Sequence, residues 1–566
     1  MPGPMKLTEL PFKLLSHLPD PRGIPLVLLR SAITARAVKN AVKKEVKGSI
    51  KKQWRTLQEQ AQWVDDSQVC GIQVGEVSGD SAIVWLRCPW PANVRVHWRT
   101  ATDHKNDAGE VEQCSWQGAD VHTVQAPAAL AHSDLTSRVT LHGLPRGEHV
   151  AVRVVASPLQ DQGGPWVRDT CFRCAPDDAR PIKFAWSADV GGQGFGIRRD
   201  ATGSSGMPVF DVLRGRGLDF FVHVGDTIYA DHPLSCTVKD ERGRDWHNIT
   251  TQARSKVAET VDDFRGNYRY NWLDAGFARF CSEVPQLAIW DDHEVVNNWS
   301  PSLSLARDKR YQNKDLCLLA AHASQAFREY MPMPLDGFDG AGRLYRRVSY
   351  GPLLDVFLID MHSHRGPNDH NLQETPDGMT CLFGSAQLAW LKQALLESTA
   401  TWKVLAAGMP LGLNVPDGLD SEGRVKWQGI ANGDDGAPKG RELELADLLS
   451  FVKRHHLHNL VWLCGDVHYP AAHHYDPAQA HHKDFLPFWE FVAGPLHAGS
   501  YGPLNPDGTF GLQVRYARTS PLRGASPAAG FQSFGEVTID AQSKVMTVTL
   551  FNGEGHALHT ERLTPH

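Results

Sequence analysis

The chain has 566 residues, more than a single hydrophobic core usually holds, so two or more domains are expected. A composition of 42% hydrophobic and 22% charged residues is typical of a folded globular protein and excludes wholesale disorder. The formal net charge of −6 argues against attraction of a polyanion by the whole protein, so we expect no nucleic-acid partner. A small anionic substrate would need a local positive centre, which bound metal ions can supply.

Residues 1–65 are expected to form a helical, basic, amphipathic extension. Apolar side chains recur at every fourth position, which indicates one face of a helix, and lysines occupy several of the positions between them. The apolar residues are Val38, Val42, Val46, Ile50 and Trp54. One interpretation is a solvated helix packed on the main body. The other is a helix that makes peripheral contact with an anionic membrane surface.

No apolar run approaches the roughly 18 residues needed to cross a bilayer. The apolar stretch 24–29 is short, and Arg30 follows it without a small-residue cleavage site. We therefore identify no export signal and expect a cytoplasmic location.

Residues 66–177 are predicted to form a small all-β sandwich domain. Short segments rich in β-branched residues recur there, punctuated by Gly and Pro, at 81–87, 94–98, 137–141 and 150–155. Regular short strands without helices favour a sandwich. The catalytic constellation is expected elsewhere.

Residues 178–566 alternate apolar strands with longer helical or loop stretches, which indicates a layered α/β architecture. Helices are expected near 279–284 and over 385–397. The segments 535–540 and 544–550 are predicted to form a closing hairpin.

Five apolar strands of this body are followed directly by carboxylates. These are Asp189 after 183–188, Asp226 after 219–224, the run Asp291-Asp292-His293-Glu294 after 286–290, Asp360 after 354–359, and Asp466 after 459–464. A lone Asp after a strand is usually a turn or cap residue. Four ionisable residues directly after a buried strand, however, are costly unless something binds them.

Ligands bind beyond the carboxyl ends of strands in open α/β sheets, so these carboxylates are expected to share one pocket. Like charges packed together cost stability unless a cation neutralises them. Oxygen ligands with interspersed His suit divalent or trivalent metals, and two metals about 3.5–4 Å apart clamp both oxygens of a displacement at phosphorus.

The segments 184–194, 222–231, 290–299, 465–468 and 491–499 resemble the signatures of PhoD-like phosphatases. This is the alkaline phosphatase D group within the calcineurin-like metallophosphatases. Trp-Asp-Asp-His-Glu at 290–294 is the most diagnostic segment. The resemblance runs from about residue 66 to the C-terminus. It implies a four-layer α/β/β/α metallophosphatase sandwich in 178–566, preceded by the small all-β domain.

The resemblance also implies a multinuclear metal centre. One metal would be held by Asp226, Tyr229 and His468, with Asp189 beside them. Asp226 would bridge to a second metal, whose other ligands are Asp292, Asp466 and Asn297.

The ligand types favour certain metal ions at this centre. The motif Gly-Asp-Xaa-Xaa-Tyr, here 225–229, also occurs in purple acid phosphatases, where the tyrosinate binds ferric iron. Tyr229 therefore favours Fe3+, with Ca2+ as the partner ion. The best-known form of the family has a Cys ligand at or near the place of Asp189, so this site is harder. Mn2+, Mg2+ and Zn2+ stay open as alternatives.

The expected activity is hydrolysis of phosphodiesters, phosphomonoesters or both, by a metal-activated water. Arg365 is the candidate phosphate clamp, since guanidinium binds two phosphate oxygens at once. A surface ion pair is its alternative role. His293 is the candidate proton donor to the leaving oxygen, with orientation of Asp292 as the alternative. Asp291 and Glu294 are assigned to structural support.

The expected substrate is a small phosphoester or a phospholipid-like diester. An alternative function is a non-catalytic metal-binding or adhesion protein that recognises a polymer through its β-sandwich. Family analogy gives a periplasmic or extracellular location as the alternative to the expected cytoplasmic one. The oligomeric state stays open.

Overall fold

The computed structural model describes residues 63–101, 116, 120–160, 163–199, 205–334 and 343–566. Most of the predicted N-terminal extension, up to Gln62, lies outside the described residues. Its helix and its membrane contact therefore stay predictions. The described part forms one compact unit from Trp63 to His566.

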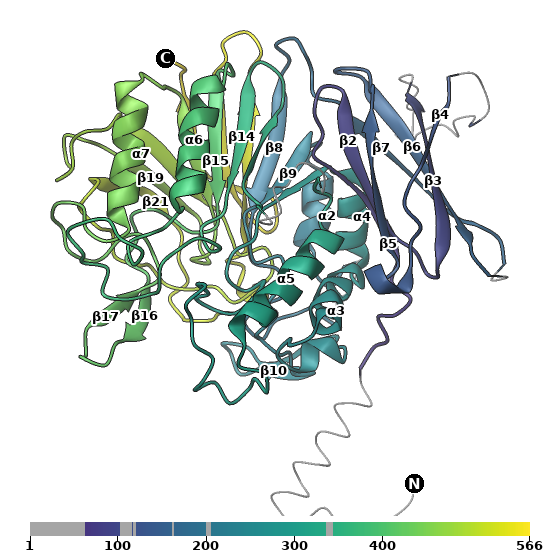
Figure 1. Ribbon diagram of the computed structural model, residues 1–566, viewed down its shortest axis with the longest axis horizontal. Coiled ribbons are helices and arrows are strands. Elements are labelled where there is room, and N and C mark those ends of the chain that lie inside the picture. The colour runs from purple at the N-terminus through teal and green to yellow at the C-terminus, as the bar shows by residue number, and fades with distance from the viewer. Residues whose placement is uncertain (1–62, 102–115, 117–119, 161–162, 200–204, 335–342) are drawn as a thin grey trace, which may run out of the picture. The chain divides into compact units, whose positions relative to one another are not determined.

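Two large sheets make up the body (Figure 1). In sheet order, the nine-stranded sheet contains β24 (Ala557–Leu563), β23 (Met546–Asn552), β22 (Ser533–Ile539), β8 (Ile182–Ser187), β9 (Phe220–His223), β12 (Gln286–Ala288), β1 (Gly71–Gly75), β2 (Ser81–Arg87) and β5 (Thr136–His142). The seven-stranded sheet contains β13 (Arg346–Ser349), β14 (Leu354–Ile359), β15 (Trp402–Ala407), β18 (Leu460–Cys464), β20 (Phe488–Val492), β19 (Ala471–Tyr475) and β21 (Leu512–Ala517).

Smaller elements complete the described chain. A four-stranded sheet has the order β4 (His122–Gln125), β3 (Ala92–Thr100), β6 (His149–Pro158) and β7 (Trp166–Arg173), and two hairpins are β10 (Thr237–Lys239) with β11 (Asp245–His247), and β16 (Pro416–Leu419) with β17 (Val425–Trp427). The α-helices are α2 (Val209–Arg214), α3 (Val261–Trp272), α4 (Ala275–Glu283), α5 (Leu316–Tyr330), α6 (Ser385–Glu397) and α7 (Glu442–Arg454). Short 3-10 turns are η4 (Ala131–Ser133), η5 (Ala253–Ser255) and η6 (Pro527–Ala529).

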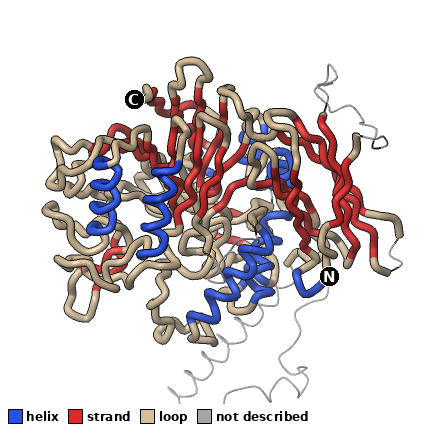
Figure 2. Tube along the Cα trace, turned by 45° about the horizontal axis from the view of Figure 1, so that its top comes forward, coloured by secondary structure: helices blue, strands red, loops and turns tan. Residues whose placement is uncertain are grey.

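The two large sheets pack against each other, and helices cover their outer faces (Figure 2). Along β15, Val404 joins the apolar core shared with the nine-stranded sheet, whereas Leu405 joins the core under α6 and α7. Along β9, the Phe220 ring packs on Tyr350 beside the other sheet, and Phe221 packs on Phe280 of α4. This alternation follows from the period of two in a strand. The predicted mixed α/β fold is confirmed.

Local sequence signals explain where the helices begin. Thr260 and Asp263 form a capping box at the start of α3, and Asp274 caps α4 by accepting the N–H of Phe277. Helix α6 has the predicted bounds 385–397. The predicted C-terminal hairpin is β22 with β23, and β24 adds an edge strand that the sequence pattern had not indicated.

The strands predicted within 66–177 are present, but they divide between two sheets. Strands β1, β2 and β5 extend the nine-stranded sheet, because Gly75 of β1 pairs in parallel with Gln286 of β12. Strands β4, β3, β6 and β7 form the separate four-stranded sheet. The domain boundaries at 65 and 177 stay predictions. Three strands of the segment 66–177 belong to the nine-stranded sheet of the segment that follows.

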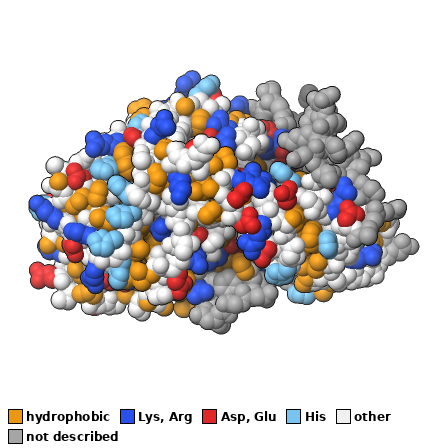
Figure 3. Space-filling view, turned by 90° about the horizontal axis from the view of Figure 1, so that it is seen from above, with side chains coloured by type: hydrophobic (Ala, Val, Ile, Leu, Met, Phe, Trp, Pro, Cys, Tyr) orange, Lys and Arg blue, Asp and Glu red, His pale blue; other side chains and the backbone are white. Residues whose placement is uncertain are grey.

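In the described part of the chain, no helix has the length and apolarity needed to cross a bilayer. The longest described helix, α5, has 15 residues, against about 20 for a membrane span. Acidic and basic side chains are interspersed on the face shown in Figure 3, as expected from the small net charge.

Candidate metal centre

Three central strands end in residues with left-handed backbone conformation. The φ angle is 68° at Asp189 after β8, 50° at Asp226 after β9 and 64° at Asp466 after β18. His468, on the same loop as Asp466, has a φ of 60°. Non-glycine residues adopt this conformation at a cost of about 1–3 kcal/mol, and such strain is concentrated at functional sites.

Asp189, Tyr229 and His468 converge at the first candidate metal position. The Tyr229 hydroxyl donates to Asp189 Oδ1 at 3.2 Å and lies 2.9 Å from His468 Nε2. His468 Nδ1 donates to the carbonyl oxygen of Gly499, so Nε2 keeps its lone pair. Burial lowers the pKa of His468 to about 3, which keeps the imidazole in the neutral form that binds metals.

Asp226 links this first group to a second one. The ligand atoms of Asp189, Asp226 and His468 lie within 4.8 Å of one another. Those of Asp226, Asp292 and His293 also lie within 4.8 Å of one another. Asp226 thus occupies the position that a carboxylate bridging two ions would take.

Asp292 keeps one carboxylate oxygen available. Its Oδ2 accepts hydrogen bonds from the backbone N–H of Asn298 and, at 3.2 Å, from Gln428 Nε2. Its Oδ1 and Asp189 Oδ2 are both buried without a hydrogen-bond partner among the described residues. A buried carboxylate oxygen without a donor is costly unless a cation binds it.

The carboxylates of this cluster repel one another. Burial and then neighbouring carboxylates raise the pKa of Asp189 and of Asp226 well above the usual value. The pKa of Asp466 is raised by its burial and by the charges of Asp291 and Asp292. A bound cation would remove this penalty, and carboxylate, imidazole and phenol donors suit hard or borderline metal ions. The side chains present therefore fit a multinuclear metal centre.

Tyr229 is enclosed by the carboxylates that it contacts. Burial, Asp189 and Asp226 together raise the pKa of its hydroxyl well above the usual value, so a tyrosinate here would require a cation beside it. Gly192 provides room for the ring, because a Cβ atom at Gly192 would lie 2.3 Å from Tyr229 Cδ2.

The candidate centre opens into a pocket of about 550 Å³. The predicted site residues that line it are Asp226, Asp292, His293, Asn297, Asp466 and His468. The structure therefore brings the residues of both predicted metal positions to one place. Their individual roles as ligands stay predictions.

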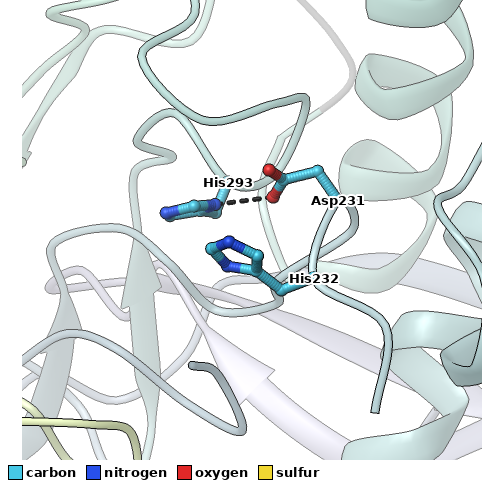
Figure 4. Close-up of side chains that lie close together, drawn as sticks. All are labelled: Asp231, His232 and His293. Carbon is cyan, nitrogen blue, oxygen red and sulfur yellow. Dashed lines mark hydrogen bonds and ion pairs between the residues drawn. The ribbon is translucent and has the colours of Figure 1, made fainter. Parts of the chain in front are cut away.

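His293 is held by a residue that the sequence analysis did not assign. Figure 4 shows His293 Nδ1 directed at Asp231, whose Oδ1 lies 2.6 Å away. His293 Nε2 lies 3.8 Å from Asp292 Oδ1. The ring of His232 lies 4.8 Å from the ring of His293. The sequence signal for Asp231 was its place on the same loop as Asp226.

Glu294 ties two ligand-bearing loops together. It accepts backbone hydrogen bonds from Asp226 at 3.2 Å, Thr227 at 2.6 Å and Asp291 at 2.8 Å. Asp291 in turn accepts a hydrogen bond from His362 Nε2 at 2.8 Å. These contacts fit the structural support predicted for Asp291 and Glu294.

The prediction that Asp360 adds a fifth carboxylate to this pocket is wrong. Its Oδ1 accepts hydrogen bonds from the backbone N–H groups of His362 and Ser363 and from Trp290 Nε1. Asp360 is thus a turn residue, which is the ordinary role of an Asp after a strand.

Arg365 is buried and lies outside the set of residues that line the pocket. Its Nη2 donates to the carbonyl oxygen of Gln428 and, at 2.9 Å, to Asn368 Oδ1. Because Gln428 donates to Asp292, Arg365 supports the second group indirectly. Its role as a phosphate clamp stays a prediction.

The sequence model of a family described as PhoD-like phosphatase matches residues 184–550. The chain belongs to this family. The matched region of this PhoD-like phosphatase includes every predicted site residue, from Asp189 to His468.

Alkaline phosphatase D of Bacillus subtilis (strain 168) is a curated relative of this family member. It is 30% identical over 302 residues, which are 50% of this chain and 47% of that protein. The match therefore spans about half the length of the curated relative.

Two solved structures share the fold of this PhoD-like phosphatase. One, described as the structure of PhoD, superposes with a TM-score of 0.60 at 18% identity, over 88% of this chain and 92% of that one. The other, purple acid phosphatase PPD1 from yellow lupin (Lupinus luteus) seeds, gives a TM-score of 0.50 at 11% identity, over 87% and 74% of the two chains.

Asp226→Asn should remove more metal than Asp189→Asn, because Asp226 belongs to both ligand groups and Asp189 to one. We expect Asp226→Asn to lose about two ions per chain and Asp189→Asn about one ion per chain, measured by mass spectrometry of the purified proteins. The matched control is Asp245→Asn. Asp245 is an exposed carboxylate on β11 that pairs with Lys239 of β10. Equal metal content in wild type and Asp226→Asn would contradict the prediction that Asp226 binds both ions.

Proposed function

We propose that this chain hydrolyses phosphoesters, either diesters or monoesters, at a multinuclear metal centre. The observation that carries the proposal is the position of Asp226, which belongs to two groups of possible ligand atoms and lines a pocket. Membership of the PhoD-like phosphatase family supports the same reaction class. When bound, the metal ions would supply an activated water and neutralise charge that develops on the phosphoryl oxygens.

The chain itself supplies a positioned proton. Because Asp231 accepts the hydrogen bond of His293 Nδ1, the second ring nitrogen, Nε2, is left to act toward the pocket. Burial alone would lower the pKa of His293, but Asp292 and Asp231 outweigh it and raise this pKa to about 10. A bound cation would neutralise part of the Asp292 charge, so the pKa in the loaded protein is expected to lie lower. We propose that His293 Nε2 protonates the leaving oxygen.

We further propose ferric iron at the group of Asp189, Tyr229 and His468. A phenolate ligand suits a trivalent ion, and the raised pKa of Tyr229 means that a weakly charged ion would leave it protonated. Calcium suits the second predicted metal position, since the carboxylate and amide oxygens of Asp292, Asp466 and Asn297, which line the same pocket, are hard ligands. Manganese, magnesium and zinc are the other outcomes of a metal analysis.

Tyr229→Phe should abolish the visible absorption that a tyrosinate bound to ferric iron produces, and should lower iron content. The reason is that phenylalanine keeps the ring and removes the phenolate oxygen. Absorption spectra and metal content of the purified variant check this. Tyr501→Phe, a neighbouring tyrosine that lines the pocket, is the matched control for the spectrum. An unchanged spectrum in Tyr229→Phe would exclude tyrosinate ligation.

Purified protein should hydrolyse bis(4-nitrophenyl) phosphate or 4-nitrophenyl phosphate, and chelation of its metals should abolish turnover. Asp226→Asn should lower kcat by about 1,000-fold or more, because both ions are affected. Metal-replete protein that turns over neither ester would favour the alternative of a non-catalytic metal-binding or adhesion protein. The ratio of the two rates decides between diester and monoester.

Asp231→Asn and His293→Gln should lower kcat by about 100-fold or more for a phenyl leaving group, and by much less for 4-nitrophenyl. A good leaving group needs no protonation, so the loss of a proton donor should depend on leaving-group pKa. The plot of log kcat against leaving-group pKa should steepen in both variants. Parallel plots for wild type and variants would assign His293 to orientation of Asp292 instead.

A further inference from the structure

The pocket extends well beyond the candidate metal ligands. Its volume of about 550 Å³ lies in the range of sites for whole small molecules and exceeds what one phosphoryl group fills. Asp226, Asp292 and Asp466 contribute carboxylates to its lining. Part of the wall is apolar and contains Val415, Pro416, Val467, Pro503, Leu504 and Pro521, and the rest is polar. There is room for a substituent of the ester besides the reacting phosphoryl group.

Arg523 is the one arginine or lysine among the described residues that line this pocket. Its guanidinium lies over the Tyr501 ring, 5.7 Å from the centroid, and makes no ion pair with a carboxylate in the described part of the chain. Other arginines in the described part of the chain form ion pairs with carboxylates, for example Arg216 with Glu536 at 2.7 Å. Arg523 therefore offers its N–H donors to a ligand.

The position of Arg523 is fixed relative to the first ligand group. The Tyr501 hydroxyl donates to Gln193 Oε1 at 2.9 Å, and its ring stands edge-on to His468 with centroids 5.0 Å apart. The loop that carries Arg523 is attached at both ends. The N–H of Ser520 donates to the Tyr501 carbonyl at 2.9 Å, and Ala525 exchanges two backbone hydrogen bonds with Ser500.

Arg523 and the proton donor lie toward different ligand groups. His293 belongs to the second group with Asp226 and Asp292, whereas Arg523 is connected through Tyr501 to His468 of the first. A substrate whose leaving oxygen meets His293 would therefore direct its retained substituent toward Arg523.

We propose that Arg523 determines specificity by binding an anionic group on the retained substituent of a phosphodiester. The inference rests on the proposed function and names a substrate class for the same site: diesters that carry a second anion, a carboxylate or a phosphate, beyond the phosphoryl group that is hydrolysed. Guanidinium forms two parallel hydrogen bonds to either anion, and the aromatic face of Tyr501 supports it. The apolar part of the pocket wall accommodates the connecting part of the substituent.

The test compares diesters with one leaving group and different retained substituents. These are 4-nitrophenyl phenyl phosphate, its 4-carboxyphenyl and 4-phosphonophenyl analogues, and 4-nitrophenyl phosphorylcholine, whose retained group is cationic. Wild type should show kcat/KM about tenfold or more higher for an anionic analogue than for the phenyl ester. The carboxylate and phosphonate arms show which anion is preferred.

Arg523→Ala should reduce this preference to a ratio near one, and Arg523→Glu should shift it toward the phosphorylcholine ester. The ratio of kcat/KM values is the readout, so a general loss of activity does not imitate the result. Arg515→Ala, an exposed arginine on β21 outside the pocket, should keep the wild-type ratio.

Two results would overturn the inference while the proposed function stands. One is equal kcat/KM of wild type for the phenyl and anionic esters. The other is an unchanged preference in Arg523→Ala. Absence of turnover of every diester and of 4-nitrophenyl phosphate by metal-replete wild type would overturn the proposed function, and the role of Arg523 with it. Turnover of the monoester alone would restrict the proposed function to monoesters and would also remove the role of Arg523.

Discussion

Mutual repulsion of buried carboxylates is the constraint on which the centre of this protein depends. Asp189, Asp226 and Asp292 are almost fully buried within reach of one another, and taking even one ionised carboxylate out of water costs several kcal/mol. A bound cation would remove this cost, provided that the folded chain holds the carboxylates together. The left-handed turns at Asp189, Asp226 and Asp466 and the hydrogen bonds around them serve that purpose.

Much of that support comes from other acidic residues with a different task. The carboxylate of Glu294 accepts hydrogen bonds from backbone N–H groups, and that of Asp360 accepts them within its own turn. The carboxylate of Asp231 accepts a hydrogen bond from His293. Each is buried as deeply as the candidate ligands, yet each is satisfied by donors from the protein. The candidate ligands therefore differ from these residues in the number of hydrogen-bond donors around the carboxylate. Asp189 Oδ2 and Asp292 Oδ1 lack them within the described residues.

This distinction explains what the sequence predicted and what it did not. Apolar runs that end in carboxylates predicted the strands and the convergence of Asp226 and Asp466, because strand direction alone delivers them to one edge. The same rule failed for Asp360. Its carboxylate accepts hydrogen bonds from N–H groups of the turn, and the sequence pattern does not show these donors. Gln428 and Arg523 lie within loops whose paths depend on tertiary packing, so spacing gave no signal for their approach to the site. Asp231 shares a loop with Asp226, but the sequence pattern did not show that it contacts His293. The shared sheet was missed because one parallel bridge far along the chain joins β1 to β12.

That bridge also sets an order of assembly. Strand β1 leaves the ribosome early, but its parallel neighbour β12 includes Gln286. Strands β22, β23 and β24, which extend the sheet on the other side of β8, come last. The edge of β1 thus stays unpaired through the synthesis of most of the intervening chain. Long-range parallel pairing is slow and leaves strand edges exposed to other chains. Until Gln286 has been synthesised, this edge of β1 therefore lacks its native strand partner.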